Sequence, residues 1–80
     1  MFSTYILKSE TDNKYYYGLA ENVERRLSEH NAGKVIATKN RKPLKLHYTE
    51  SFKTKKEALK REMFFKKRSG YKWLKENNII

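Results

Sequence analysis

Short apolar stretches with turn-forming residues between them open the chain. Residues 2–8 and 15–19 are rich in aromatic and branched side chains, and residues 11–13 between them are turn formers. Two such stretches joined by a short polar turn are typical of a β-hairpin. Because side chains alternate along a strand, the second stretch would place Tyr16 and Gly18 on one face, and a strand glycine often marks the close approach of another group.

The pattern after this hairpin predicts a helix. Asn22 is a favourable N-cap, and the helix would end near Asn31, before a left-handed stop at Gly33. Arg26 and His30 are spaced i and i+4, so they would share one side of the helix. We expect both side chains to lean over the same part of the sheet.

The middle of the chain predicts a loop and a third strand. Residues 34–43 carry four cations between Gly33 and Pro43, which predicts a flexible basic loop. From Leu44 to Thr49 apolar residues alternate with polar ones, and this is the clearest strand signal in the sequence.

The C-terminal part predicts two helices. Thr54 and Glu57 form a capping-box pattern, which predicts a helix through about Arg68. The Ser-Gly pair at 69–70 would interrupt it, and residues 71–77 would form a last short helix against the core. The order ββαβαα predicts an α+β fold in which helices flank a small, mainly antiparallel sheet.

The chain is small and strongly basic. Its 80 residues carry 19 Lys and Arg against 9 Asp and Glu, a formal net charge of +10. A chain of this length has room for one core, so we expect a single domain over residues 1–80 and exclude a multidomain enzyme. Its cations are spread along the chain rather than set opposite one apolar helix face, which favours nucleic acid over a membrane as the partner.

Composition excludes several classes of protein. The chain has no cysteine, so disulfides, thiolate zinc sites and cysteine nucleophiles are excluded. Its apolar runs are far shorter than the roughly 20 residues that a membrane span needs, and no apolar signal segment opens the chain. We therefore expect a soluble cytoplasmic protein.

One acidic residue lies where an apolar residue is expected. On the predicted helix that begins at residue 54, Glu62 falls inside the apolar arc marked by Ala58 and Phe65. A carboxylate that faces a core is destabilising unless a cation, a metal or hydrogen-bond donors meet it. Glu62 either pairs with a core-facing arginine, sits at the edge and bends into water, or is a metal ligand in a cleft.

Tyr16, Arg26, His30 and Glu62 together are a workable set for cutting a phosphodiester. Each alone has an ordinary structural explanation, such as a packed aromatic or an ion-paired cation. Together, a divalent cation at Glu62 would neutralise phosphate oxygens, and Arg26 would supply donors suited to phosphate. Tyr5 or Tyr16 could then deprotonate water, provided that the nearby arginine, histidine and metal lower a phenol pKa from about 10.

Motifs along the whole chain resemble the GIY-YIG nuclease superfamily. Four stretches carry the resemblance: Tyr5-Ile6-Leu7, Tyr16-Tyr17-Gly18, Asn22-Val23-Glu24-Arg25-Arg26-Leu27 with His30, and Arg61-Glu62. The chain is most similar to small stand-alone bacterial members that look like the N-terminal nuclease module of the nucleotide-excision-repair excinuclease. It departs from the family pattern at Ser3-Thr4, where Gly-Ile is usual, and at Tyr17, where Ile is usual, without loss of a reactive group.

The resemblance implies a fold, an activity and a set of site residues. It implies a three-stranded antiparallel sheet flanked by helices, and hydrolysis of DNA phosphodiester bonds with one Mg²⁺ or Mn²⁺ ion, in repair or recombination. Carried over position by position, it implies catalytic roles for Tyr5, Tyr16, Arg26 and His30, a structural role for the motif glycine Gly18, and metal binding by Glu62.

Nucleic-acid contacts are predicted on the basic surface. The candidate phosphate contacts are Lys34, Lys39, Arg41, Lys42, Lys45 and Lys60. The substrate is expected to be duplex or branched DNA, and RNA stays open. A basic nucleic-acid-binding module without catalysis is the alternative function, and an accessory protein that binds a repair complex through exposed aromatics such as Phe64 is a third.

Overall fold

A computed structural model describes all residues from 1 to 80. It contains the elements β1 (Phe2–Ser9), β2 (Tyr15–Ala20), α1 (Val23–Asn31), β3 (Leu44–Phe52), α2 (Lys55–Phe65) and α3 (Arg68–Glu76). The predicted α+β fold and the order of its elements are confirmed. No helix combines the length and the apolar character that crossing a membrane requires.

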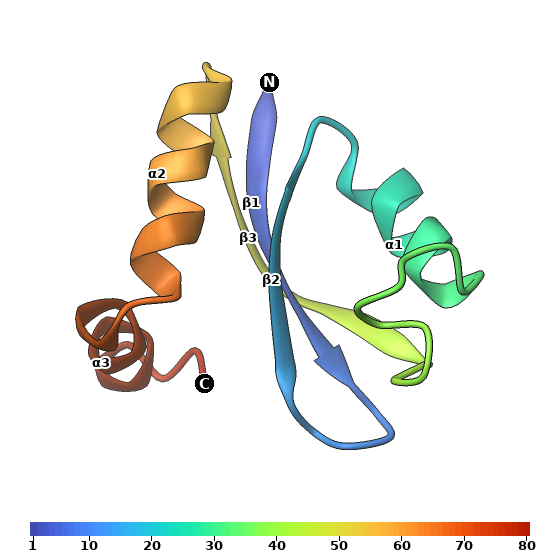
Figure 1. Cartoon of the computed structure of the whole chain (residues 1–80). Helices are drawn as coiled ribbons and strands as arrows, with labels where there is room; N and C mark the ends of the chain where they lie inside the picture. Colours follow the sequence, from blue (N-terminus) through green and yellow to red (C-terminus); the bar gives the residue numbers. More distant parts are fainter.

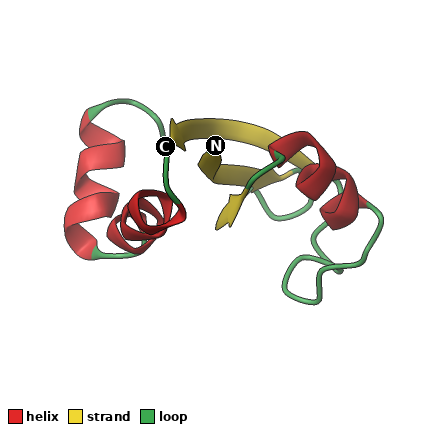
Figure 2. Ribbon diagram, turned by 90° about the horizontal axis from the view of Figure 1, so that it is seen from above, coloured by secondary structure: helices red, strands yellow, loops and turns green.

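The sheet has three antiparallel strands in the order β2-β1-β3, so β1 lies at its centre. Figures 1 and 2 show α1 on one side of the sheet and α2 with α3 on the other. Tyr5 and Leu7 pack in a core on the α1 side. Ile6 packs on the opposite side against Phe65 and Leu74. Alternate residues of β1 therefore build two small cores.

A β-bulge divides the predicted alternation in β3. Ile6 pairs with Tyr48, whereas Leu7 pairs with Leu46, so His47 is an extra residue on β3. An extra residue reverses the faces of the residues beyond it. Leu46 and Tyr48, which the alternation placed on one face, therefore lie on opposite faces of the sheet.

The helix predicted to run through Arg68 is two helices. α2 ends at Phe65, and Gly70 lies inside α3 rather than interrupting a helix. A Cβ at Gly70 would lie 1.8 Å from the Phe64 carbonyl oxygen. Glycine is therefore needed because the first turn of α3 packs directly on the end of α2.

Phe64 lies under α3 and not on an open outer face. It is half-buried, and its ring centroid lies 6.4 Å from that of Trp73 and 6.0 Å from that of Phe65. The prediction of an exposed Phe64 is wrong, because a helical wheel for α2 alone does not show that α3 folds back over it. Trp73 and Leu74 do pack on this core, as predicted.

The basic loop between α1 and β3 is tied to β1 and the turn after it. Ser9 Oγ donates to the Arg41 carbonyl oxygen at 2.6 Å, and the Glu10 amide donates to the Pro43 carbonyl oxygen at 2.9 Å. Thr38, in the middle of the loop, is fully buried. These anchors join residues more than 30 positions apart, so no local sequence pattern reveals them. The loop therefore looked flexible from the sequence alone.

Candidate active site

Three buried side chains join β1, α1 and the basic loop. The Tyr5 hydroxyl lies 3.0 Å from His30 Nε2, and His30 Nδ1 lies 2.7 Å from Thr38 Oγ1. With a proton on Nδ1, the imidazole donates to Thr38 and accepts from the Tyr5 hydroxyl, and the other tautomer reverses both bonds. Contacts at both nitrogens hold the His30 ring in one orientation beside the tyrosine.

Burial sets the protonation states of this group. Burial lowers the pKa of His30, and the Arg26 guanidinium lowers it further. The imidazole is therefore neutral at pH 7, because its ordinary pKa is already near 6.5. Burial also raises the pKa of the Tyr5 phenol, although Arg26 acts in the opposite direction. Arg26 therefore lowers the pKa of this phenol as expected, but burial outweighs it and the pKa is raised overall.

β2 shapes the space around Tyr5. Gly18 pairs with Tyr5 across the sheet, and a Cβ at Gly18 would lie 2.3 Å from both Cζ and the hydroxyl oxygen of Tyr5. Any side chain at this position would displace the ring, so the close approach expected at Gly18 is present. Tyr16, on the same face, has its ring centroid 6.5 Å from that of Tyr5 and 5.0 Å from that of His30.

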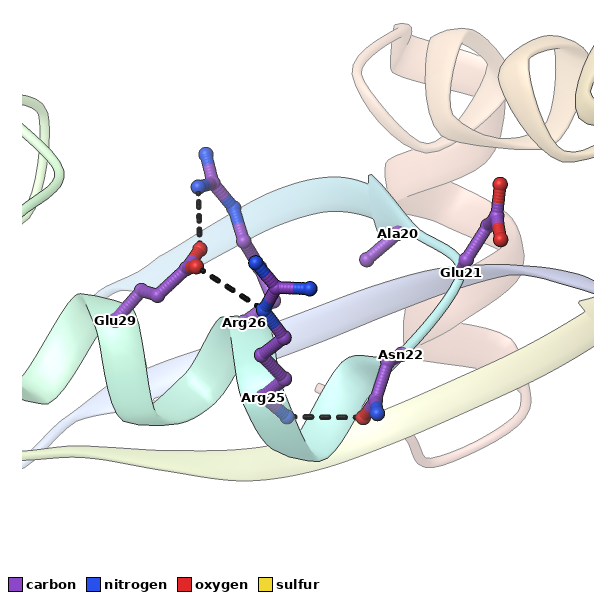
Figure 3. A pocket seen from close by; sticks show the side chains of 6 residues that line it. All are labelled: Ala20, Glu21, Asn22, Arg25, Arg26 and Glu29. Carbon is purple, nitrogen blue, oxygen red and sulfur yellow. Dashed lines mark hydrogen bonds and ion pairs between the residues drawn. The ribbon is translucent and has the colours of Figure 1, made fainter.

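Arg26 borders a hollow beside these rings. Its Nη1 donates to Glu29 Oε1 at 3.0 Å, and its side chain is 39% exposed. Figure 3 shows Glu29 accepting from Arg26 and Arg25, while Asn22 caps the start of α1. The hollow has a volume of about 450 Å³ and is lined by Ala20, Glu21, Asn22, Arg25, Arg26 and Glu29. One side of the Arg26 guanidinium is thus held, and the rest is open to an anion.

Glu62 reaches this region from α2. Its side chain is 15% exposed, and Oε2 accepts from Lys66 Nζ at 2.7 Å. The carboxylate is close enough to raise the pKa of the Tyr5 phenol. Of the alternatives open from sequence, pairing with a core-facing arginine is wrong, because the partner is an exposed lysine one turn along α2. Glu62 is largely covered and lies near the tyrosine and histidine group.

The Glu62 carboxylate suits a metal ion that a substrate phosphate also binds. No group of three or more His, Cys, Asp or Glu side chains that could hold a metal ion is present. Mg²⁺ commonly keeps several waters and binds one or two carboxylates together with substrate phosphates. A single carboxylate suits such a site, and the Lys66 ammonium already places a positive charge at Glu62 Oε2.

The predicted phosphate contacts fall into two groups. Arg41 Nε pairs with Asp12 at 2.9 Å, and Lys45 Nζ pairs with Glu10 at 2.9 Å. Asp12 and Glu10 therefore already neutralise these two cations. The other four are exposed and form no ion pair: Lys34, Lys39, Lys42 and Lys60.

Sequence reasoning misses two residues beside the predicted site. In the sequence Thr38 is only a hydrogen-bond former in a loop, and no local pattern pairs it with His30. Lys66 carries one local signal, because its i, i+4 spacing from Glu62 allows an ion pair on α2. The structure otherwise brings Tyr5, Tyr16 and His30 together, with Arg26 at the border.

Comparisons with known proteins agree on one family. A family model described as the GIY-YIG catalytic domain matches residues 1–77. A UPF0213 protein of Bacillus licheniformis is 49% identical over 59 residues, which cover 72% of this chain and 61% of that protein. The matched part thus spans less than two thirds of this relative. A UPF0213 protein of Halobacterium salinarum is 41% identical over 70 residues, which cover 86% of this chain and 90% of that protein.

A solved structure supports the same relationship. The solution NMR structure of a UPF0213 protein from Bacillus halodurans matches with a TM-score of 0.55 and 32% sequence identity. The match covers 95% of this chain and 84% of that chain. The resemblance in sequence therefore extends to the fold.

Proposed function

The chain belongs to the GIY-YIG catalytic-domain family, and from this premise we propose that it is a divalent-metal-dependent DNA endonuclease that acts in repair or recombination. The GIY-YIG domain is a nuclease domain, which implies nuclease activity on a nucleic acid, and GIY-YIG nucleases generally use a divalent metal. In this proposal residues 1–80 act as one nuclease domain in the cytoplasm.

The observation that carries the proposal is the convergence of Tyr5, Tyr16 and His30, with Arg26 at the border and Glu62 acting on Tyr5. The two tyrosine rings and the imidazole lie within 6.5 Å of one another, centroid to centroid. Arg26 and Glu62 both alter the pKa of Tyr5. Four different elements contribute these side chains, so the fold brings groups suited to phosphoryl chemistry into one place.

Arg26 binds the scissile phosphate in this proposal. Glu29 holds one side of the guanidinium, and the exposed remainder faces the hollow. Guanidinium N–H groups match phosphate oxygens in a two-bond geometry. Glu29 therefore orients the arginine, and the free donors take the anion.

Tyr5 and His30 accept the proton of the attacking water. The neutral imidazole is in the state needed to accept a proton near pH 7. As the Tyr5 oxygen takes a proton from water, its own proton passes to Nε2 over the 3.0 Å contact. Tyr16 is the second phenol within reach, and exchanging each tyrosine for phenylalanine separates their roles.

Glu62 holds the metal in this proposal, with Mg²⁺ or Mn²⁺ as the single ion. A bound divalent ion stabilises negative charge on the phosphate and on the leaving oxygen. Lys66 must leave the carboxylate for the ion to bind, and its side chain is 52% exposed, so it can swing into solvent. Substrate phosphate and water would supply the remaining ligands.

The basic surface binds the polymer around the scissile bond. Lys34, Lys39, Lys42 and Lys60 are free for phosphates, whereas Arg41 and Lys45 contribute only if they leave Asp12 and Glu10. These four lysines therefore remain proposed phosphate contacts. Duplex and branched DNA are the proposed substrates, and RNA is the comparison substrate.

A metal-stimulated nicking assay tests the proposed activity. Supercoiled plasmid, a branched DNA and a single-stranded RNA are each incubated with Mg²⁺ or Mn²⁺. We expect cleavage of DNA by the wild type, and a loss of at least about 100-fold in Arg26→Ala and in Glu62→Gln. Glu76→Gln, a matched loss of one carboxylate on α3, should cleave as the wild type does.

Two outcomes contradict this function. Wild-type cleavage that persists unchanged in Arg26→Ala and Glu62→Gln excludes the assigned site. Binding without metal, with no cleavage of any substrate, instead favours a non-catalytic nucleic-acid-binding module.

A further inference from the structure

The outer face of α2 carries four exposed lysines: Lys55, Lys56, Lys60 and Lys66. Only Lys66 forms an ion pair, and its partner is Glu62. Glu57 lies in the first turn, where its Oε1 accepts a hydrogen bond from Thr54 Oγ1. The lysines on this face are therefore largely uncompensated.

The placement of these lysines does not favour the helix. Lys55 and Lys56 lie in the first turn of α2, where the helix dipole disfavours cations. Lys56 and Lys60 are spaced i and i+4, and such a like-charge pair destabilises a helix. Their positions thus lower the stability of α2, and an external anion would offset this cost.

The lysine face borders the carboxylate of the proposed metal site. At about 100° per residue, Lys55, Lys66 and Leu59 lie roughly 20°, 40° and 60° around the helix from Glu62, whereas Lys56 and Lys60 lie roughly 120° and 160° from it. α2 and α1 both contact the edge strand β2, so this strand joins the helix that carries Glu62 to the helix that carries Arg26 and His30. A polymer bound along this face would therefore lie on one flank of Glu62, at Lys55 and Leu59.

Two exposed apolar side chains lie among the lysines. Leu59 is 43% exposed and Met63 is 52% exposed, and they are one turn apart. Neither packs against the two cores of this chain. A mixture of cations and small apolar contacts fits the phosphates and sugars of a nucleic acid backbone.

The basic loop is a weaker candidate for the main binding surface. Figures 1 and 2 show it on the α1 side of the sheet, away from α2. Two of the predicted contacts near it, Arg41 and Lys45, already pair with Asp12 and Glu10. The cation that pairs with Glu62, Lys66, lies one turn along from it at the end of α2.

We infer that the outer face of α2, formed by Lys55, Lys56, Leu59, Lys60 and Met63, is the main nucleic-acid-binding surface and guides the substrate backbone to Glu62. The part of this inference that leads the substrate to Glu62 rests on the proposed nuclease function, in which Glu62 holds the metal. Binding itself does not depend on cleavage.

Two triple variants test the inference with equal changes of charge. One replaces Lys55, Lys56 and Lys60 on α2 with glutamine, and the matched control replaces Lys34, Lys39 and Lys42 on the loop. Affinity for a short DNA duplex is measured in EDTA by fluorescence anisotropy at several salt concentrations. Circular dichroism melting checks that both variants are folded, and glutamine keeps a good helix propensity in α2.

The α2 variant should bind on the order of tenfold more weakly, with a log-log salt slope smaller by about 2.7 for three lost contacts. The loop variant should lose clearly less affinity, and less of the salt slope, than the α2 variant. An equal or larger loss in the loop variant overturns the inference. So does a concentration-dependent dimer mass that only the α2 variant abolishes, since α2 would then be a contact between copies.

The two proposals fail in different ways. Wild-type protein that binds through α2 but cleaves nothing leaves the surface standing and contradicts the nuclease function. Cleavage that depends on Glu62, together with unchanged binding by the α2 variant, contradicts only the surface.

Discussion

Tyr5 is positioned by its neighbours rather than by any feature of its own. The missing side chain at Gly18 leaves room for its ring, and His30 binds its hydroxyl. The Thr38 hydroxyl in turn forms a hydrogen bond with the other ring nitrogen of His30, Nδ1. A phenol and a neutral imidazole therefore share one buried contact, and burial determines the pKa of each more than charge does.

The lowered pKa of His30 predicts a loss of stability on the acid side. The unfolded chain binds a proton near pH 6.5, whereas the folded chain resists it, so the unfolded state holds more protons between the two pKa values. The contribution of His30 is complete above about pH 6.5 and is lost as the pH falls toward the folded pKa. Urea unfolding between about pH 7.5 and pH 5.5 measures this fall.

The variant His30→Gln should be less stable at pH 7.5, and its free energy of unfolding should fall less over this range. Asn40→Gln, a change of a non-titrating side chain on the exposed part of the basic loop, should keep the wild-type dependence on pH. A wild-type slope that survives in His30→Gln would show that another group causes it.

Lys66 competes with any cation for Glu62. Its ammonium lies 2.7 Å from Oε2, on a helix face where no other carboxylate offers it a partner. Partly exposed ion pairs contribute roughly 0.2–1 kcal/mol, so Lys66→Gln should raise the affinity for Mn²⁺ about two- to fivefold. Titration followed by the electron paramagnetic resonance of free Mn²⁺ measures this without substrate.

Lys72→Gln, on α3, is the control of equal charge and should leave Mn²⁺ binding as it is. Glu62→Gln should remove the binding. Weaker Mn²⁺ binding in Lys66→Gln would mean that the lysine supports the ion rather than competing with it.

The contact between α2 and α3 depends on one glycine. The sequence predicted both helices, but it placed the break after Arg68 because Gly70 is usually a helix breaker. In the structure Gly70 is buried inside α3, against the backbone of Phe64 and Phe65. Local propensity could not reveal this, because the space that excludes a Cβ belongs to another helix.

Replacing Gly70 with alanine should destabilise the fold at or above about 3 kcal/mol. The new Cβ would lie 1.8 Å from a backbone oxygen, which cannot turn aside as a side chain can. Thermal unfolding measures the effect. Ser69→Ala, at the exposed neighbouring position, is the control and should change stability by less than about 0.5 kcal/mol. Equal stabilities of the two variants would contradict the close contact between the helices.

The net charge of +10 acts on the molecule as a whole. It favours the binding of any phosphate polymer. The structure shows, in addition, which cations are free and which are already neutralised by carboxylates. The two cores on either side of β1 hold α1 and α2 against opposite faces of one sheet, and both helices contact β2.

Duplex affinity should fall steeply with salt and depend little on sequence. About six neutralised phosphates give a log-log slope near −5. Titrations of two duplexes with unrelated sequences between about 50 and 200 mM salt measure the slope and the sequence preference together. A slope near zero, or strong preference for one duplex, would contradict binding through backbone phosphates.

The sequence by itself determined the elements, their order and the family, because hairpin, capping and motif signals are local in the chain. It also placed Tyr16 with Gly18, and Arg26 with His30, because strand and helix periods fix which residues share a side. Only the tertiary structure decided that Thr38 holds His30, that Glu62 of α2 acts on Tyr5 of β1, and that burial outweighs the cations in the pKa of that phenol. These outcomes depend on desolvation and on contacts between residues far apart in the chain, which no local pattern contains.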